Sequence, residues 1–197
     1  MKRTEQNPDL AGRKILLCVT GGIAAYKSVD LASKLAAEGA KVKTAMTEAA
    51  CQLVGPKSFE AVTDSAVFTS LWETGGGEAI RHVGLVEWAE IVVVAPATAD
   101  IIAKFANGIC DDLVSTVLCV CWSKPIILAP AMNVDMWNNP AVQRNVNALK
   151  IMGVRLIGPA KGRLACGVIA EGRMSEPQEI LDAIEQLARE VRHKNKR

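Results

Sequence analysis

Residues 14–39 read KILLCVTGGIAAYKSVDLASKLAAEG, and this stretch decides the fold. Apart from its first lysine, the segment 14–19 is a continuous apolar run, which is typical of a strand buried on both faces of a parallel sheet. Residues 20–22 predict a tight turn, and apolar residues then recur at helical spacing over 23–38 until Gly39 stops the helix. The stretch therefore predicts a strand, a turn and a helix, the repeating unit of an α/β domain.

The same alternation continues along the chain. We expect further strands at residues 41–46, 91–95, 125–128 and 154–157, and helices at 83–88, 99–106, 112–122, 140–152 and 176–192. Residues 55–80 are less regular, with a surface loop at the glycine run 75–77, and residues 159–174 are expected to form a Gly-rich loop.

These elements predict a single α/β domain over residues 14–190. Its core would be one doubly wound parallel sheet, Rossmann-like or flavodoxin-like, with helices on both faces. Residues 1–13 are expected to be a flexible N-terminal segment, and residues 191–197 a solvated basic tail.

The composition excludes several classes of protein. A formal net charge of +2 provides no basic field for nucleic acid. No apolar run reaches the roughly 18–20 residues that span a bilayer, so we expect no membrane partner. The six cysteines lie mostly in apolar segments, which favours a cytoplasmic protein with reduced thiols. Cys119 and Cys121 have no second pair at zinc spacing, and we expect no metal site.

The loops that carry functional residue types follow the predicted strands. In a doubly wound sheet, ligands bind outside the carboxyl ends of the strands. Here those ends carry residues 20–22, Thr47, residues 96–100 and residues 130–133. The sequence therefore predicts a ligand site along this one edge of the sheet.

The turn Gly21-Gly22-Ile23 joins the first strand to a helix N-terminus, where free N–H groups and the helix dipole favour a phosphate. The dinucleotide fingerprint is absent. The turn is a near miss to the ATP-binding P-loop, because Tyr26 stands where that motif has its second glycine. A purely structural turn is the other alternative, and we favour the phosphate of a mononucleotide.

Other polar residues have both a structural and a functional interpretation. Thr98 and Asp100 either cap the helix that they open or bind a cofactor. Asn133 is either a turn residue or an amide donor for a substrate carboxylate. His82 is the only histidine outside the basic tail, so it is either a surface residue or the group that titrates near neutrality.

Cys166 lies in the predicted Gly-rich loop rather than in an apolar strand. Arg163 and Arg173 lie near it in the sequence and could lower its pKa or bind an anion. A reactive thiol and an inert one are both compatible with this position.

Taken in order, these segments resemble the motifs of the homo-oligomeric flavin-containing cysteine decarboxylase family. The resemblance covers residues 13–185. The segments that carry it are TGGIAAYK at 20–27, His82 with WAE at 88–90, PATAD at 96–100, ANG at 106–108 with DDL at 111–113, PAMN at 130–133, and ACG at 165–167 with GRM at 172–174.

The resemblance implies FMN as cofactor, bound between subunits of a homotrimer or a multiple of trimers. It implies that His82 is the active-site base, that Asn133 binds the substrate carboxylate, and that Cys166 donates a proton from a flap. The residues that it assigns to FMN are Gly21, Gly22, Ile23, Thr47, Pro96, Ala97, Thr98 and Asp100. Those that it assigns to the substrate are Met132, Asn133, Ala165, Arg173 and Met174.

The implied activity is FMN-dependent decarboxylation of 4′-phosphopantothenoylcysteine to 4′-phosphopantetheine in coenzyme A biosynthesis, a carboxy-lyase reaction. A phosphopantothenate–cysteine ligase is an implied partner. Two alternatives stay open: a peptidyl-cysteine decarboxylase of lantibiotic maturation, and a non-catalytic flavoprotein regulator of the same fold. Ala170 departs from the family, which often has glycine there, and could stiffen the flap.

Overall fold

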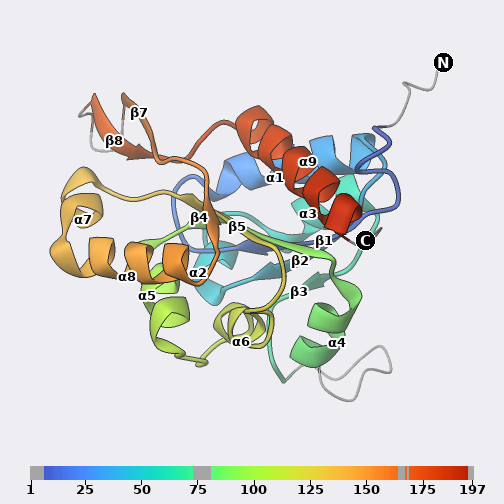
Figure 1. Cartoon of the computed structure of the whole chain (residues 1–197), viewed down its shortest axis with the longest axis horizontal. Helices are drawn as coiled ribbons and strands as arrows, with labels where there is room; N and C mark the ends of the chain where they lie inside the picture. Colours follow the sequence, from blue (N-terminus) through green and yellow to red (C-terminus); the bar gives the residue numbers. More distant parts are fainter. Residues whose placement is uncertain (1–6, 73–80, 164–166, 168, 195–197) are drawn as a thin grey trace.

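A parallel sheet with helices on both faces is formed by the residues that the computed structural model describes, which are 7–72, 81–163, 167 and 169–194 (Figure 1). Within these ranges the sheet has six strands in the order β3-β2-β1-β4-β5-β6. The strands are β1 Lys14–Val19, β2 Lys41–Met46, β3 Val67–Phe68, β4 Ile91–Ala97, β5 Ile126–Pro130 and β6 Arg155–Leu156. The predicted doubly wound α/β class is confirmed.

The two central strands, β1 and β4, are apolar because both of their faces are covered. Residues 15–19 of β1 and all of β4 are buried. The two strands pair in parallel, with Ile15 opposite Ile91 and Cys18 opposite Val94. This explains why the sequence shows continuous apolar runs here rather than alternation.

The order of the strands creates a crevice at one edge of the sheet. From β1 the chain moves outward through β2 to β3, and it then returns to place β4 on the other side of β1. The connections that leave β1 and β4 therefore diverge to opposite faces. Such a switch point is where doubly wound sheets bind their ligands.

Helices form a layer on each face of the sheet. One layer contains α1, α3 and α9, and the other contains α4, α5, α6 and α8 (Figure 1). The helices are α1 Ala25–Ala37, α2 Glu48–Cys51, α3 Pro56–Thr63, α4 Arg81–Trp88, α5 Ala99–Asn107, α6 Leu113–Val120, α7 Val134–Asn138, α8 Pro140–Ile151 and α9 Pro177–Lys194.

Helix α1 begins two residues later than the apolar pattern predicts. Ile23 and Ala24 belong to a turn, in which the Ala25 N–H donates to the Gly22 carbonyl at 2.8 Å. The predicted stop is confirmed, since Gly39 has a φ of +83° that favours glycine. The later start widens the turn after β1.

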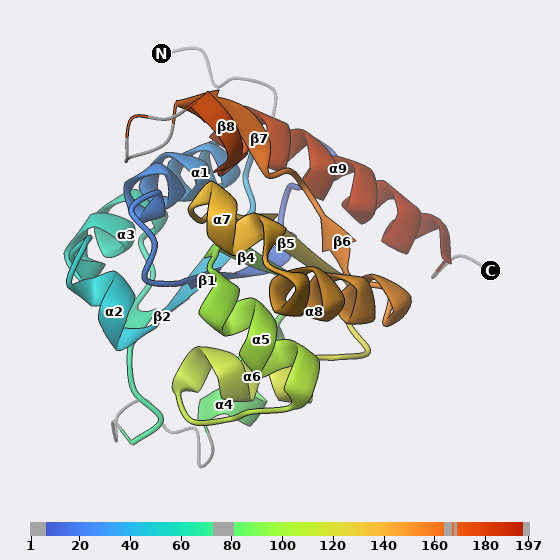
Figure 2. The ribbon, with the colours of Figure 1, turned by 90° about the vertical axis from the view of Figure 1, so that its left-hand side faces the viewer.

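The Gly-rich loop predicted at residues 159–174 is wrong. The described part of this segment forms an antiparallel hairpin of β7, Ala160–Arg163, and β8, Ile169–Arg173. The hairpin lies beside α7 and near the start of α9 (Figure 2). Its strands are short and glycine-bearing, so no alternating apolar pattern reveals them. The departure at Ala170 is accommodated in a strand, where it pairs with Gly162.

The described parts of the two terminal segments pack against the domain. Residues 1–13 were expected to be flexible. Within the described residues 7–13, Leu10 is fully buried in the core and Arg13 forms a 2.7 Å ion pair with Glu90. At the other end, α9 continues to Lys194 instead of ending near Arg192. Leu10 and the amphipathic α9 supply the apolar contacts that fix these segments. The glycine run at 75–77 lies outside the described residues.

Candidate active site

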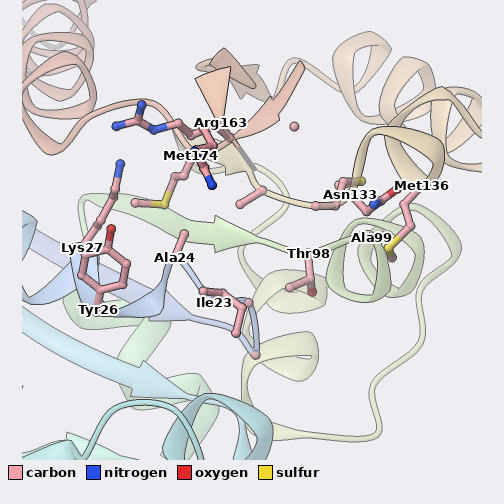
Figure 3. A pocket seen from close by; sticks show the side chains of 16 residues that line it. Ile23, Ala24, Tyr26, Lys27, Thr98, Ala99, Asn133, Met136, Arg163 and Met174 are labelled. Atoms are coloured by element: carbon pink, nitrogen blue, oxygen red, sulfur yellow. The ribbon is translucent and has the colours of Figure 1, made fainter. Parts of the chain in front are cut away.

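A pocket of about 700 Å³ lies at the switch point between β1 and β4 (Figure 3). It is bounded by the turn after β1, the start of α5, the segment after β5 and the hairpin. Its volume suits a small-molecule ligand. The lining residues are Gly21, Gly22, Ile23, Ala24, Tyr26, Lys27, Thr98, Ala99, Ala131, Met132, Asn133, Met136, Arg163, Gly172, Arg173 and Met174.

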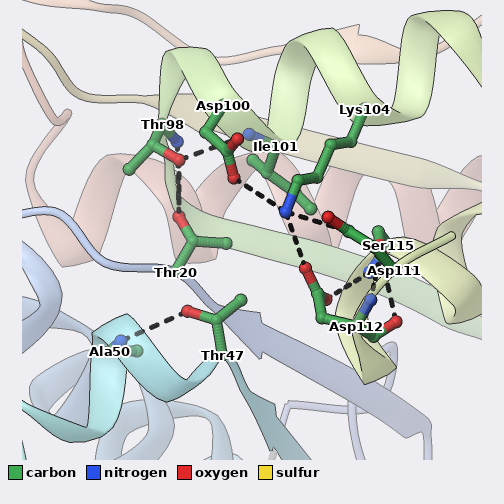
Figure 4. Close-up of polar contacts among 10 residues, drawn as sticks. All are labelled: Thr20, Thr47, Ala50, Thr98, Asp100, Ile101, Lys104, Asp111, Asp112 and Ser115. Carbon is green, nitrogen blue, oxygen red and sulfur yellow. Dashed lines mark hydrogen bonds and ion pairs between the residues drawn. The ribbon is translucent and has the colours of Figure 1, made fainter. Parts of the chain in front are cut away.

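A hydrogen bond between neighbouring loops fixes one side of the pocket. The buried Thr20 hydroxyl donates to the Pro96 carbonyl at 2.6 Å. The same oxygen lies 3.3 Å from the Thr98 hydroxyl and accepts from the Thr98 N–H at 3.3 Å (Figure 4). The loops after β1 and β4 are thereby held together across the switch point.

The glycines of the turn permit close approaches that a side chain would obstruct. A Cβ at Gly21 would lie 2.4 Å from the Cβ of Ala49 in α2. A Cβ at Gly22 would lie 3.4 Å from both Pro96 Cγ and Thr98 Cγ2, which is ordinary contact. Gly21 is therefore the position where the turn depends on glycine.

The turn presents backbone N–H groups to the pocket. Within the described residues, the N–H groups of Ile23 and Ala24 donate to no backbone carbonyl, and they precede the 13-residue helix α1. A helix N-terminus with free N–H groups favours an anion. The turn therefore offers N–H donors to an anion, and the phosphate site stays a prediction.

Asn133 lies on the opposite side of the pocket, directly after β5. It caps α7, and its Oδ1 accepts from the Asp135 N–H at 2.7 Å. Beside it, the Met132 N–H donates to the Gly172 carbonyl at 2.9 Å. That bond joins the end of β5 to the hairpin, so Met132, Asn133, Arg173 and Met174 are brought to one pocket.

Four residues assigned to the cofactor by resemblance do not line this pocket. They are Thr47, Pro96, Ala97 and Asp100. Thr47 caps α2, accepting from the Ala50 N–H at 3.2 Å, and Asp100 forms a 3.3 Å ion pair with Lys104. Thr98 is both a helix cap, accepting from the Ile101 N–H at 3.4 Å, and a lining residue.

Lys104 of α5 forms ion pairs with several acidic side chains (Figure 4). Its ammonium lies 2.9 Å from Asp111 and 3.1 Å from Asp112. Burial alone would lower the pKa of Lys104, but hydrogen bonds to these two carboxylates outweigh that effect and raise it above its ordinary value. Asp112 also caps α6 through the Ser115 N–H at 2.9 Å. The cluster fixes the α5–α6 connection.

The structure does not bring His82 to the pocket of its own chain. His82 is half-buried near the start of α4, in the layer that contains α5 and α6 (Figure 1). It is not a lining residue. Ala165 and Cys166 lie outside the described residues.

Some lining residues were not assigned a role from the sequence. Tyr26 and Lys27 were part of the motif at residues 20–27 but were given no role, although the helical period from Ile23 could have placed Lys27 on the pocket side. Met136 lies three residues after Asn133 on α7, a spacing that puts both side chains on one helix face.

The described ranges hold neither a cluster of metal-ligating side chains nor a membrane-spanning helix. They contain no group of three or more His, Cys, Asp or Glu side chains that could bind a metal ion. They also contain no helix that is both long and apolar enough to span a bilayer.

Curated relatives match most of this chain. The bifunctional coenzyme A biosynthesis protein CoaBC of Bacillus subtilis is 45% identical over 176 residues, which are 89% of this chain and 43% of the relative. The CoaBC protein of Escherichia coli K12 is 45% identical over 173 residues, covering 88% of this chain and 42% of the relative. The chain therefore spans less than half the length of these relatives.

Solved structures match over nearly their whole length. A PPC decarboxylase mutant complexed with pantothenoylaminoethenethiol has a TM-score of 0.82 and 31% identity, covering 89% of this chain and 98% of the other. The FMN-binding protein AtHal3 has a TM-score of 0.79 and 32% identity, covering 89% and 96%. The FMN-dependent cysteine decarboxylase SpaF has a TM-score of 0.77 and 34% identity, covering 91% and 98%.

The family model described as Flavoprotein matches residues 3–189, which is nearly the whole chain. The resemblance drawn from the sequence motifs is confirmed by this match together with the relatives above. The chain belongs to the flavoprotein family, among the flavin-dependent cysteine decarboxylases and their relatives.

Proposed function

We propose that this chain catalyses the FMN-dependent decarboxylation of 4′-phosphopantothenoylcysteine to 4′-phosphopantetheine, a carboxy-lyase reaction of coenzyme A biosynthesis. The observation that carries the proposal is one pocket flanked by the α1 N-terminus on one side and by Asn133 on the other. The similarity to CoaBC proteins and to a PPC decarboxylase supports it.

The residues of the pocket fit flavin mononucleotide. Gly21 to Ile23 would bind the phosphate through N–H groups at the start of α1, where the close packing of Gly21 on α2 leaves no room for a side chain. Ile23, Ala99 and Met132 offer apolar surface to a planar ring, and Thr98 offers a hydroxyl. Thr47, Pro96, Ala97 and Asp100 do not line the pocket, so any effect that they have on the flavin would be indirect.

The protein groups have separate roles in this proposal. When bound, the flavin supplies two-electron oxidation and reduction of the substrate's cysteine moiety. The Asn133 amide donates to the substrate carboxylate and orients it. The imidazole of His82 accepts a proton from the substrate, and the Cys166 thiol returns one after CO₂ has left, as the resemblance implies.

A homotrimer, or a multiple of trimers, is part of the proposal because His82 does not line the pocket of its own chain. A second copy would supply the imidazole. Large apolar side chains that the single chain leaves exposed support an interface, and they include Trp72, Ile109, Val120 and Trp122.

Co-expression of two inactive variants tests the shared site. His82→Asn and Asn133→Asp are each expected to abolish CO₂ release. Hybrid oligomers would contain some sites with a native His82 from one subunit and a native Asn133 from the other, so activity should return. Continued inactivity of hybrids shown to contain both variants would contradict a site between subunits.

Mass spectrometry of the flavin-bound protein tests the substrate. The protein is incubated separately with 4′-phosphopantothenoylcysteine and with a peptide that ends in cysteine. We expect only the first to lose CO₂ and become 4′-phosphopantetheine. Conversion of the peptide alone would favour a peptidyl-cysteine decarboxylase, and conversion of neither would favour a regulatory flavoprotein.

A ligase activity that makes the substrate is a proposed partner, since the CoaBC relatives are named bifunctional and are more than twice as long as the matched region. We also propose a cytoplasmic location. The exposed free thiols Cys110 and Cys119 suit a reducing compartment.

A further inference from the structure

Among the residues that the structure describes, the charged side chains that line the pocket are all cationic. They are Lys27, Arg163 and Arg173, and none of the described aspartates or glutamates belongs to the lining. The three come from two elements, with Lys27 on α1 and both arginines on the hairpin. A pocket wall with one sign of charge attracts an anionic group.

One carboxylate partly neutralises this cluster from behind. The Lys27 ammonium lies 3.0 Å from both carboxylate oxygens of Glu176, and the Arg173 guanidinium also contacts Glu176. These hydrogen bonds and charges, with Lys27 first, lower the pKa of Glu176, so it stays ionised near neutrality. Three cations and one carboxylate leave a net charge of about +2 at this wall.

An irregularity in the hairpin directly precedes Arg173. The pairing shifts between Lys161–Glu171 and Ala160–Arg173, which leaves Gly172 as an extra residue with a φ of 142°. The side chain of Arg173 lies against Gly162. A Cβ added at Gly162 would lie 3.0 Å from Arg173 Cδ. The glycine at 162 therefore leaves room for this arginine.

The cations lie on a different side of the pocket from the proposed flavin phosphate site. In Figure 3, Lys27 and Arg163 lie near Met174 and the hairpin, whereas Ile23 and Thr98 line the opposite side. The Met132–Gly172 hydrogen bond connects the hairpin to the backbone next to Asn133. The cluster thus belongs to the side of the pocket that would hold the substrate.

We propose that Lys27, Arg163 and Arg173 form the subsite for the phosphate monoester of the substrate, an inference that rests on the proposed function. A phosphate monoester carries a charge of about −1.5 to −2 near pH 7, which complements the wall. One guanidinium group can donate two parallel hydrogen bonds to two oxygens of a phosphate. A peptide that ends in cysteine lacks this group, so the subsite selects against it.

Calorimetric titration of the flavin-bound protein tests the subsite without turnover. The probes are 4′-phosphopantothenate and pantothenate, which differ only in the phosphate. We expect the native protein to bind the phosphorylated probe at least about tenfold more tightly. Arg163→Gln should lose about tenfold of that affinity, Arg163→Lys should lose less, and binding of pantothenate should not change.

Lys161→Gln is the matched control, because it removes a cation from the same strand at a residue that does not line the pocket. It should leave both affinities unchanged. Equal affinity of the native protein for the two probes, including no binding of either, would overturn the inference. If Arg163→Gln weakened the binding of both probes equally, the inference would also be overturned. Loss of the flavin absorbance in the Arg163→Gln variant would overturn it as well.

The two proposals fail in different ways. If 4′-phosphopantothenoylcysteine is not decarboxylated but the phosphorylated probe is preferred, the proposed reaction is wrong and the subsite stands. If the reaction occurs and no preference for phosphate is measured, only the subsite is wrong.

Discussion

The pocket has two sides that are held together by different forces. The floor comprises residues 20–23 and 96–98, and the roof comprises the hairpin β7–β8 with Glu176. The floor is fixed by the buried 2.6 Å hydrogen bond from Thr20 to Pro96 and by close packing of glycine. The roof is fixed by half-exposed ion pairs to Glu176 and by one backbone bond from Met132 to Gly172.

This difference separates stability from selectivity. Buried hydrogen bonds and packing contribute strongly to folding, whereas exposed ion pairs contribute little. We therefore expect changes in the floor to lower stability and flavin content, and changes in the roof to alter the choice of substrate. The following variants test that division, from the largest expected effect to the smallest.

Gly21→Ala should have the largest effect. The added Cβ would approach Ala49 Cβ to 2.4 Å, so the turn or α2 must move. We expect a loss of about 3 kcal/mol in the free energy of unfolding and a lower flavin content, measured by denaturation and by absorbance. Gly22→Ala is the control, because its Cβ meets neighbours at 3.4 Å. Equal effects of the two variants would contradict the floor geometry.

Thr20→Val should have the next largest effect. It keeps the shape of the side chain but leaves the Pro96 carbonyl without its buried donor. The expected loss is about 2 kcal/mol by chemical denaturation. Thr63→Val removes a 2.8 Å bond to Phe59 within the helix α3 and should cost less than about 0.5 kcal/mol. A Thr20 variant as stable as that control would show that the cross-link is unimportant.

Lys104→Met should cost about 1 kcal/mol near neutral pH, because the ion pairs it removes are only partly buried. The free energy of unfolding of the variant should also change less steeply with pH on the acid side. Hydrogen bonding to Lys104 lowers the pKa of Asp111 in the folded state, so this contribution is complete above about pH 4 and is lost as the pH falls further. Denaturation curves across this range check it, and an identical pH dependence in the native protein and the variant would contradict it.

Glu176→Gln should have the smallest effect on stability, about 0.5 kcal/mol or less, since the carboxylate is half-exposed. It removes the counterion of Lys27 and Arg173 and should therefore strengthen binding of the phosphorylated probe in the calorimetric titration. If Glu176→Gln lowered the stability as much as a floor variant does, the roof would also contribute strongly to folding, and the division between floor and roof would be wrong.

The same contrast explains what the sequence could predict. The floor follows from local patterns: an apolar run to Val19, a double glycine at 21 and 22, and a capping Thr98. The roof does not, because Gly162 and Gly172 suggest a loop and their strand pairing depends on contacts distant in sequence. The position of His82 relative to the pocket could not be predicted either. In our proposal a second copy of the chain brings His82 to the pocket, and the residue pattern of one chain does not reveal contacts between copies.

The measurement that tests the central claim most directly compares two asparagines. Asn133 and Asn139 both cap helices, accepting from backbone N–H groups at 2.7 and 2.8 Å, but only Asn133 lines the pocket. Loss of either cap should cost about 1 kcal/mol. We predict that Asn133→Ala keeps its flavin and loses conversion of 4′-phosphopantothenoylcysteine by about 100-fold or more, while Asn139→Ala stays active. Equal activity of the two variants would contradict this pocket as the active site.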